Sequence, residues 1–252
     1  MNDCVIRPAR PGDEPGACHV CLKTGDHGQD GESLYQEDPD ALGRMFVGPY
    51  LAFEPEMSLI LEDEQGICGY ALGALNSRAF YARYEAEWRQ DLCARFPAPQ
   101  GDPSHWSRAQ HVHYCYHHPD YFCPEPYDAY PSHLHIDLLP RAQGRGYGRR
   151  MLEQIMDTLR RRGSPGAHLG VSTLNTRAFG FYQCLGFREL IRVGSDRGDP
   201  VNLGDPVNNV NPVNPLNLVN PVNPVNNDGC IYMGQELGIG STGRLPKPPN
   251  GD

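Results

Sequence analysis

A glycine-rich segment, 143–148 (QGRGYG), is the part of the sequence whose chemistry is easiest to infer. It lies between an apolar segment that stops at Pro140 and an amphipathic one that begins at Arg149. A turn between a strand and a helix directs unpaired N–H donors and the positive end of the helix dipole at one point, which favours a diphosphate. The spacing is neither that of a Walker A loop nor that of a dinucleotide fingerprint. The same glycines would also suit a plain tight connection.

Three residues capable of acid–base chemistry lie just before this segment. Alternation along the predicted strand 133–139 (HLHIDLL) places His133, His135 and Asp137 on one face. Imidazole titrates near neutrality, so either histidine could take a proton from an amine. Asp137 could be the base, anchor an amine or fix a histidine tautomer. The sequence leaves open which of the three is the base, and whether the histidines only form hydrogen bonds within the sheet.

The glycine-rich segment resembles the acetyl-CoA signature of the GNAT superfamily of N-acetyltransferases, Gln/Arg-x-x-Gly-x-Gly/Ala. Asn175 at the start of the next helix and FYQCLGF at 181–187 resemble further family features, in the family's order and spacing. VIRPAR at 5–10 resembles the family's first strand. The histidine-rich stretch 111–118 resembles loops of acetyltransferase-like domains related to O-GlcNAcases.

The resemblance implies a binding site for acetyl-CoA as co-substrate. Backbone N–H groups of the glycine-rich segment would hold the pyrophosphate, and main-chain groups of Leu138 and Leu139 would pair with the pantetheine arm like an added strand. The Leu138 N–H could also polarise the acetyl carbonyl. Arg149 would add charge near a phosphate or be an ordinary exposed helix residue. The implied coenzyme-binding residues are Leu138, Leu139, Gln143, Gly144, Arg145, Gly146, Tyr147, Gly148, Arg149 and Asn175.

Tyr182 matches the tyrosine that serves as general acid in many members of the superfamily, where it would protonate the departing thiolate. A tyrosine packed between helix and sheet is the alternative. The pair His133 and His135 is similar to the paired histidines of arylalkylamine N-acetyltransferases, with a spacing that differs by one residue. The implied reaction is direct transfer of acetyl to a primary amine in a ternary complex, since no cysteine adjoins the glycine-rich segment.

The surrounding elements predict an α/β domain with a mixed central sheet flanked by helices, which is the GNAT fold that the resemblance implies. Apolar spacing predicts helices over 13–23, 77–96, 149–162 and 175–185. Strands are predicted over 4–10, 57–62, 67–75, 133–139, 167–172, 187–193 and 230–237, the last pairing back into the sheet. The stretch 97–131 is predicted to be an irregular loop.

A Pro-Val-Asn repeat divides the chain. Proline removes backbone donors at short intervals and asparagine favours turns, so we expect a disordered insertion over 199–228. The acetyltransferase domain is then expected over 1–198 and 229–238, with a flexible tail over 239–252. The repeat has no aromatic or charged anchors for a partner.

The overall composition limits the partners. The 252 residues carry a net charge of −9, which argues against binding to nucleic acid or to an anionic membrane and favours cationic acceptors. The acceptor is expected to be a small-molecule or protein amine, and a homodimer is left open. Nine cysteines without a framework pattern, and no apparent leader, predict a cytoplasmic or nuclear protein.

The sequence also allows two interpretations other than an acetyltransferase without a metal. The histidine-rich stretch 111–118, with Cys123 beyond it, could indicate zinc, but no Cys-x-x-Cys pairs with it and the superfamily needs no metal, so none is expected. A catalytically inactive acetyltransferase-like recognition module is the alternative function. The intact glycine-rich segment argues against it, because such a module has no need of coenzyme contacts.

Overall fold

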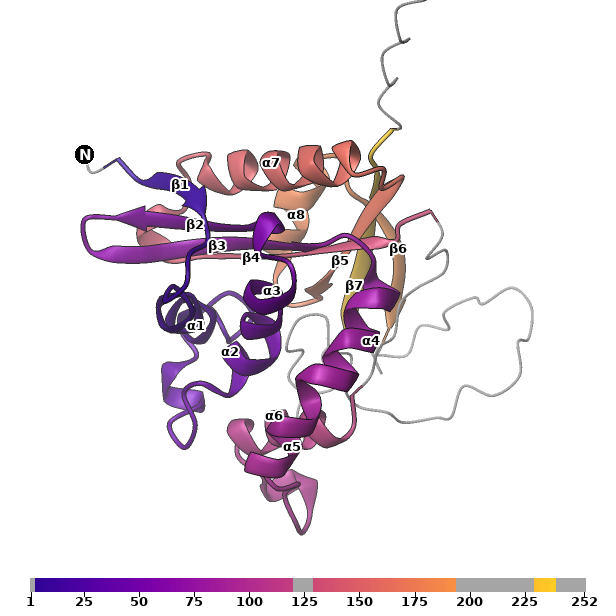
Figure 1. Ribbon diagram of the computed structural model, residues 1–252. Coiled ribbons are helices and arrows are strands. Elements are labelled where there is room, and N and C mark those ends of the chain that lie inside the picture. Colours follow the sequence, from indigo (N-terminus) through magenta and orange to yellow (C-terminus); the bar gives the residue numbers. More distant parts are fainter. Residues whose placement is uncertain (1–2, 120–128, 194–228, 239–252) are drawn as a thin grey trace, which may run out of the picture.

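The computed structural model describes residues 3–119, 129–193 and 229–238 (Figure 1). Its centre is a seven-stranded sheet with the strand order β1-β2-β3-β4-β5-β7-β6. Neighbouring strands are antiparallel except β4 and β5, which are parallel. The strands are β1 Val5–Pro8, β2 Ser58–Asp63, β3 Gly66–Ala74, β4 Ser132–Leu138, β5 Gly166–Ser172, β6 Arg188–Val193 and β7 Cys230–Glu236. The predicted mixed sheet, including the return of the last strand, is confirmed.

Helices cover both faces of this sheet. Helix α7 lies along one face, and α1, α2 and α3 lie against the other (Figure 1). The helices are α1 Glu14–Lys23, α2 Ala41–Phe46, α3 Gly48–Phe53, α4 Ser77–Glu87, α5 Arg89–Arg95, α6 Arg108–His117, α7 Tyr147–Arg161 and α8 Thr176–Cys184. No helix in the described part of the chain is both long and apolar enough to span a membrane.

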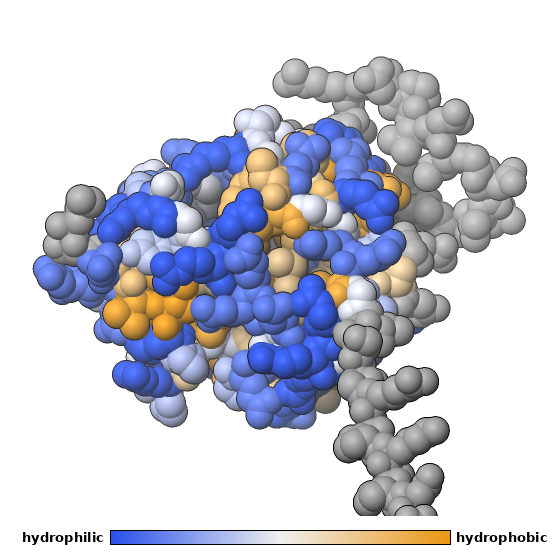
Figure 2. Space-filling view, turned by 90° about the horizontal axis from the view of Figure 1, so that it is seen from above, coloured by the Kyte–Doolittle hydropathy of each residue, from blue (hydrophilic) through white to orange (hydrophobic). Residues whose placement is uncertain are grey.

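Helix α7 is the amphipathic helix that the sequence predicts. Its apolar residues, at helical spacing, are all buried: Met151, Leu152, Ile155, Met156 and Leu159. The helix packs closely on β3, where a side chain on Gly73 would come within 2.7 Å of Ile155. The opposite side of α7 is polar, and the face seen from above is largely hydrophilic with small apolar patches (Figure 2). Burying each large apolar side chain contributes about 1.5–3 kcal/mol to this contact.

Two predictions of secondary structure are corrected. The predicted helix 77–96 is two helices that meet at Trp88, whose indole N–H donates to Arg44 O (2.8 Å). The predicted loop 97–131 contains α6, which begins with a capping box formed by Ser107 and Gln110. Its buried residues recur at helical spacing, but one of them is His111 and another histidine, His113, lies between them, so the apolar pattern is hidden. The short helices α2 and α3 were also not predicted.

The parallel strands β4 and β5 diverge, and this shapes the site. Their register holds only at Ser132–Ala167 and His133–His168. Strand β4 continues to Leu138 beside β3, whereas β5 continues to Ser172 beside β7. In the described structure the sheet is therefore open between the carboxyl-terminal halves of these two strands. The Pro-Val-Asn repeat and the tail lie outside the described residues.

Candidate active site

The glycine-rich segment forms the predicted turn from strand to helix. Strand β4 ends at Leu138, a short turn follows, and α7 begins at Tyr147. Gly144 (φ +72°) and Gly146 (φ +79°) adopt the left-handed conformation that favours glycine, and a Cβ at either would meet no atom within 4 Å. Both are exposed at the surface. The turn thus places its backbone in open space, as a backbone cradle for a ligand requires.

The backbone N–H groups of this turn are available. Within the described residues, no backbone or side-chain acceptor contacts the amide nitrogens of Gly144, Gly146, Tyr147 or Gly148, while Arg150 N, one turn into the helix, donates to Gly146 O (3.1 Å). The first N–H groups of any helix lack an acceptor within the helix, and they carry its positive dipole end. This cluster of bare donors matches the three acceptor oxygens and the negative charge of a phosphate group.

A cavity of about 470 Å³ adjoins this turn and the carboxyl-terminal end of β4, where β4 no longer pairs with β5. Strand β4, the glycine-rich segment, α8 and the loop after α1 all contribute to its wall. The lining residues are Thr24, Gly28, Gln29, Ile136, Asp137, Leu138, Ala142, Gln143, Gly144, Gly146, Tyr147, Gly148, Arg149, Asn175, Arg177, Ala178, Phe181 and Tyr182. Its size is within the range of small-molecule sites.

The structure brings most of the predicted coenzyme residues together, and it shows what several of them do. Gln143 Nε2 donates to Leu138 O (2.6 Å) and so fastens the turn to the end of β4. Asn175 caps α8, its Oδ1 accepting from Ala178 N (3.0 Å). Arg149 lies half exposed at the cavity and donates to Cys184 O (3.1 Å).

Leu139 differs from the expectation that it pairs with a pantetheine arm. Its side chain is buried in the core, its N–H donates to Cys68 O (2.8 Å) and its O accepts from Ala142 N (2.9 Å). Both of its main-chain groups are therefore already occupied. Arg145 also lies outside the cavity lining, with its guanidinium beside Cys4 (Nη1 to Sγ 3.8 Å).

Asp137 is the predicted acid–base residue on β4 that lines the cavity. Its Oδ2 accepts a hydrogen bond from Tyr70 Oη (2.5 Å) and lies 3.3 Å from His135 Nε2. Tyr70, on β3, was not identified from the sequence. The register places it directly opposite Asp137, so strand pairing is the signal that would have found it.

The hydrogen bonds of Tyr70 bear on whether His135 can act as a base. The Tyr70 hydroxyl has one proton, and the short contact to the carboxylate shows where that proton lies. With the Tyr70 proton directed at the carboxylate, the matching tautomer of His135 has its proton on Nε2, which donates to the same hydroxyl oxygen at 2.9 Å. In that tautomer Nε2 does not accept a proton. His135 is also buried against Phe46, Tyr50 and Tyr70 and does not line the cavity.

His133 lies deeper in the protein and away from the cavity. It is fully buried, it pairs with Ser77 Oγ through Nδ1 (2.8 Å) and its ring stacks on Tyr81. Its Nε2 has no hydrogen-bond partner among the described residues. Burial, assisted by the neighbouring His168 and His135, lowers the pKa of His133 well below its usual value of 6.5. His133 is therefore a neutral core residue.

This burial predicts a pH-dependent stability. The unfolded chain takes up a proton at His133 below about pH 6.5, whereas the folded protein does not. The free energy of unfolding should therefore fall as the pH drops below about 6.5, by at most about 1.4 kcal/mol per pH unit for this group. Urea unfolding at pH 7 and pH 5 should show a smaller decrease for His133→Asn than for the unchanged protein. Equal decreases would contradict the assignment.

Tyr182 lies on α8 and lines the same cavity as Asp137. Its side chain is 6% exposed. Burial, and to a smaller extent the negative charge of Asp137, raises the pKa of Tyr182 above its usual value of 10. Its phenol therefore keeps its proton at neutral pH. A protonated phenol and a carboxylate thus line the same cavity as the glycine-rich turn.

The site combines two parallel strands that diverge with a glycine-rich turn whose backbone is exposed. The family model for the acetyltransferase (GNAT) family matches residues 28–187. The chain belongs to this family.

The relatives agree with this assignment. SsHAT, whose crystal structure is known, is 32% identical in sequence to this chain. The structural match covers 94% of this chain and 99% of the SsHAT chain, with a TM-score of 0.72. The Protein O-GlcNAcases of Rattus norvegicus and Mus musculus are each 30% identical over 191 residues, which is 75% of this chain. The match spans only 20% of the length of those O-GlcNAcases.

Proposed function

We propose that this protein transfers the acetyl group of acetyl-CoA to a primary amine, by direct attack of the amine on the thioester in a ternary complex. The observation that carries the proposal is the cluster of bare amide N–H groups at Gly144, Gly146 and Gly148, which opens into a cavity that also holds Asp137 and Tyr182. Membership of the GNAT acetyltransferase family supports acetyl transfer in general.

The cavity residues indicate where each part of the coenzyme would lie. The diphosphate would lie at the glycine-rich turn, where N–H donors and the dipole of α7 converge. The pantetheine arm would extend between the diverging strands, past Ile136 and Leu138. The thioester would then reach the part of the cavity where Asp137 and Tyr182 lie. In this arrangement Leu138, which lines the cavity, adjoins the arm rather than Leu139, and Leu138 O already accepts from Gln143 Nε2.

Asp137 is the group we assign as general base. An attacking amine must be neutral, so a protonated amine has to lose a proton before or during attack. The carboxylate of Asp137 lies at the cavity surface, where it accepts a hydrogen bond from Tyr70 Oη, and Tyr70 Oη in turn contacts His135 Nε2. His135 and Tyr70 are thus positioning residues. His133, which is neutral and buried away from the cavity, takes no part.

Tyr182 is the group we assign as general acid. When the acetyl group is transferred, the C–S bond breaks and coenzyme A leaves as a thiolate, which a nearby proton donor stabilises. The raised pKa of the Tyr182 phenol means that the proton is available at neutral pH. It also means that activity should not decline through loss of this proton until the pH exceeds about 10.

Replacement of this tyrosine tests the assignment. Tyr182→Phe should lower kcat by about 10²-fold or more, as removal of a general acid typically does, because only the hydroxyl is lost. The affinity for acetyl-CoA, measured by calorimetric titration, should stay within about twofold, since the diphosphate cradle is unchanged. Turnover equal to that of the unchanged protein would remove Tyr182 from the mechanism.

The proposed reaction is tested by incubating the protein with acetyl-CoA and a panel of amines, with the released thiol as the readout. The panel should include small amines, amino sugars, peptide N-termini and lysine peptides. The acidic character of the chain favours amines that are cationic in solution. Thiol release that depends on the amine, with acetylated product detected by mass, is expected. Release without any acetylated amine would contradict acetyl transfer.

The alternative of an inactive recognition module gains no support. The cavity, the left-handed glycines and the unpaired amides are all retained. Acetyl-CoA at a hundred times its dissociation constant should stabilise the fold by about 2.7 kcal/mol. Absence of any thermal shift at millimolar coenzyme would favour that module.

A further inference from the structure

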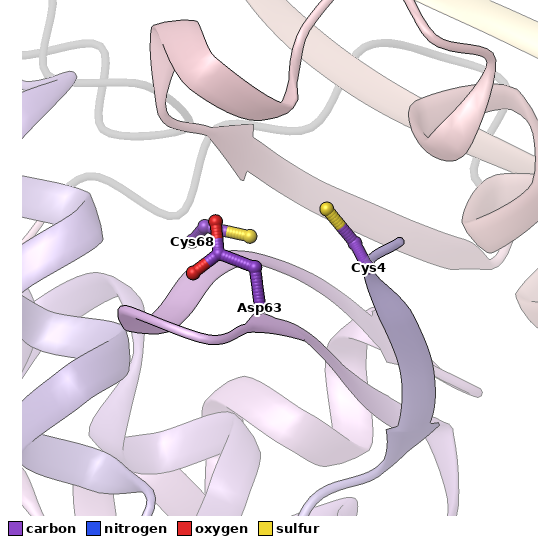
Figure 3. Close-up of side chains that lie close together, drawn as sticks. All are labelled: Cys4, Asp63 and Cys68. Carbon is purple, nitrogen blue, oxygen red and sulfur yellow. The ribbon is translucent and has the colours of Figure 1, made fainter. Parts of the chain in front are cut away.

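Two thiols and a carboxylate meet outside the cavity, near the tip of the β2–β3 hairpin (Figure 3). Cys4 immediately precedes β1, Asp63 ends β2 and Cys68 lies in β3. Their sulfur atoms and a carboxylate oxygen all lie within 4.8 Å of one another. Cys4 is 7% exposed and Cys68 is completely buried. The proposed acetyl transfer uses none of these groups.

The arrangement depends on an irregularity in β3. The register between β2 and β3 shifts at Leu61 and Glu62, which leaves Cys68 without a partner residue on β2. In a regular strand, residues two apart share a face, so Cys68 would point to the same side as Tyr70. A bulge redirects the side chain at that point. Here it brings the Cys68 sulfur toward Cys4 and Asp63 (Figure 3).

Neighbouring residues orient the Asp63 carboxylate and place positive charge beside the cluster. Arg141 Nε donates to Asp63 Oδ2 (2.8 Å) and Gln65 N donates to Asp63 Oδ1 (2.9 Å), so the carboxylate has a fixed orientation. Arg145 Nη1 lies 3.8 Å from Cys4 Sγ. Metal ligands are commonly oriented by such outer hydrogen bonds. Two thiolates and a carboxylate carry one more negative charge than a divalent cation can neutralise. The guanidinium groups of Arg141 and Arg145 lie close enough to offset it.

A second group of potential ligands shows what distinguishes this cluster. Cys21, His135 and Asp137 are equally close to one another. There, however, Tyr70 Oη bonds to both His135 Nε2 and Asp137 Oδ2, so a hydroxyl already accounts for their convergence. For Cys4, Asp63 and Cys68, the outer hydrogen bonds come from Arg141, Gln65 and Arg145. Within the cluster, Cys68 hydrogen-bonds with Cys4 and with Asp63, so the three side chains meet directly and not through a separate hydroxyl.

We propose that Cys4, Asp63 and Cys68 form a binding site for Zn²⁺ or a similar borderline divalent cation, with water as the fourth ligand. Zinc takes Cys sulfur at about 2.3 Å and carboxylate oxygen at about 2.0–2.2 Å, so tetrahedral thiolates lie about 3.8 Å apart. Ligand atoms within 4.8 Å of one another need only a small closure to reach that spacing. The inference is independent of the proposed acetyl transfer.

The site would have a structural role. Cys4 N donates to Tyr147 Oη (3.0 Å), so the start of β1 contacts the first residue of α7. A cation bound to Cys4, Asp63 and Cys68 would therefore fix the start of β1 to the hairpin and, through Tyr147, beside the glycine-rich turn.

Cobalt titration of the whole chain tests the proposal. The protein is reduced, freed of metal with a chelator, and titrated with Co²⁺ while the thiolate-to-cobalt charge-transfer absorption is recorded. We expect one equivalent to bind, Zn²⁺ to displace it, and Zn²⁺ to raise the melting temperature. Cys4→Ser and Cys68→Ser should each abolish the charge-transfer band. Cys184→Ser, at an exposed cysteine, is the matched control and should keep it.

Several results would overturn the proposal. One is an absence of the charge-transfer band in the reduced protein at stoichiometric Co²⁺. Another is a band that survives in both Cys4→Ser and Cys68→Ser but disappears in Cys21→Ser, which would place the cation in the other cluster. A third is a Cys4–Cys68 disulfide in the isolated protein together with no Co²⁺ binding after reduction. Circular dichroism of each variant checks that the loss of binding does not come from unfolding.

Discussion

Asp137→Asn is expected to lower kcat by about 10²–10⁴-fold, the usual loss when a general base is removed. The amide has nearly the same shape and can still accept the hydrogen bond from Tyr70, so the surrounding structure should persist. It cannot take a proton from the attacking amine. Steady-state kinetics with a saturating amine, together with calorimetric titration of acetyl-CoA, should show lost turnover and an unchanged coenzyme affinity.

Variants of the two positioning residues are the controls. Tyr70→Phe removes the hydrogen bond to the carboxylate, and His135→Gln replaces the ring that contacts Tyr70 Oη; both leave the carboxylate in place. Both should reduce kcat less than Asp137→Asn does. They should also shift the acidic limb of the pH profile of kcat, because the environment of the base has changed. A greater loss in His135→Gln than in Asp137→Asn would make His135 the base and would contradict our proton count.

Gly146→Ala is expected to weaken acetyl-CoA binding by about 5- to 150-fold. Gly146 has φ +79°, and a side chain in that conformation costs about 1–3 kcal/mol. The variant can relieve this strain by moving the turn, which displaces the N–H groups from the diphosphate, so binding would have to restore the strained form. Calorimetric titration with acetyl-CoA measures the effect directly, with turnover at saturating coenzyme largely retained.

The same helix provides the matched control. Gly163 follows the other end of α7, has φ +87°, and a Cβ there would likewise meet no atom within 4 Å. Gly163→Ala should lower the melting temperature to a similar extent as Gly146→Ala, because the backbone strain is alike. Its affinity for acetyl-CoA should not change. An equal loss of affinity in both variants would mean that general destabilisation, not the cradle, explains the result.

The elements that position the site could be predicted because each has a local signal. The apolar spacing of α7, the glycines before it and the alternation in β4 all act over a few residues. Helix α6 was missed because its buried residues are separated by histidines and tyrosines, and its capping box at Ser107 and Gln110 went unrecognised. The division at Trp88 depends on a distant contact with Arg44, which no local pattern contains.

The chemistry of the site was predictable only in part. Strand alternation placed His133, His135 and Asp137 on one face, but it could not separate them by depth. The sheet itself does this, since His133 lies where β4 still pairs with β5, whereas Asp137 lies where the strands have parted. Tyr70 could not be found because it reaches Asp137 through pairing of two strands that are far apart in the sequence.

The central claim is that bare amides at the start of α7 hold the diphosphate of acetyl-CoA. Calorimetric titration of the unchanged protein with acetyl-CoA and with S-acetylpantetheine, which has the same thioester and arm but no diphosphate, tests it most directly. We expect acetyl-CoA to bind at least about 100-fold more tightly, a difference of about 2.7 kcal/mol, and Gly146→Ala to reduce that difference. Equal affinities for the two compounds would contradict the account.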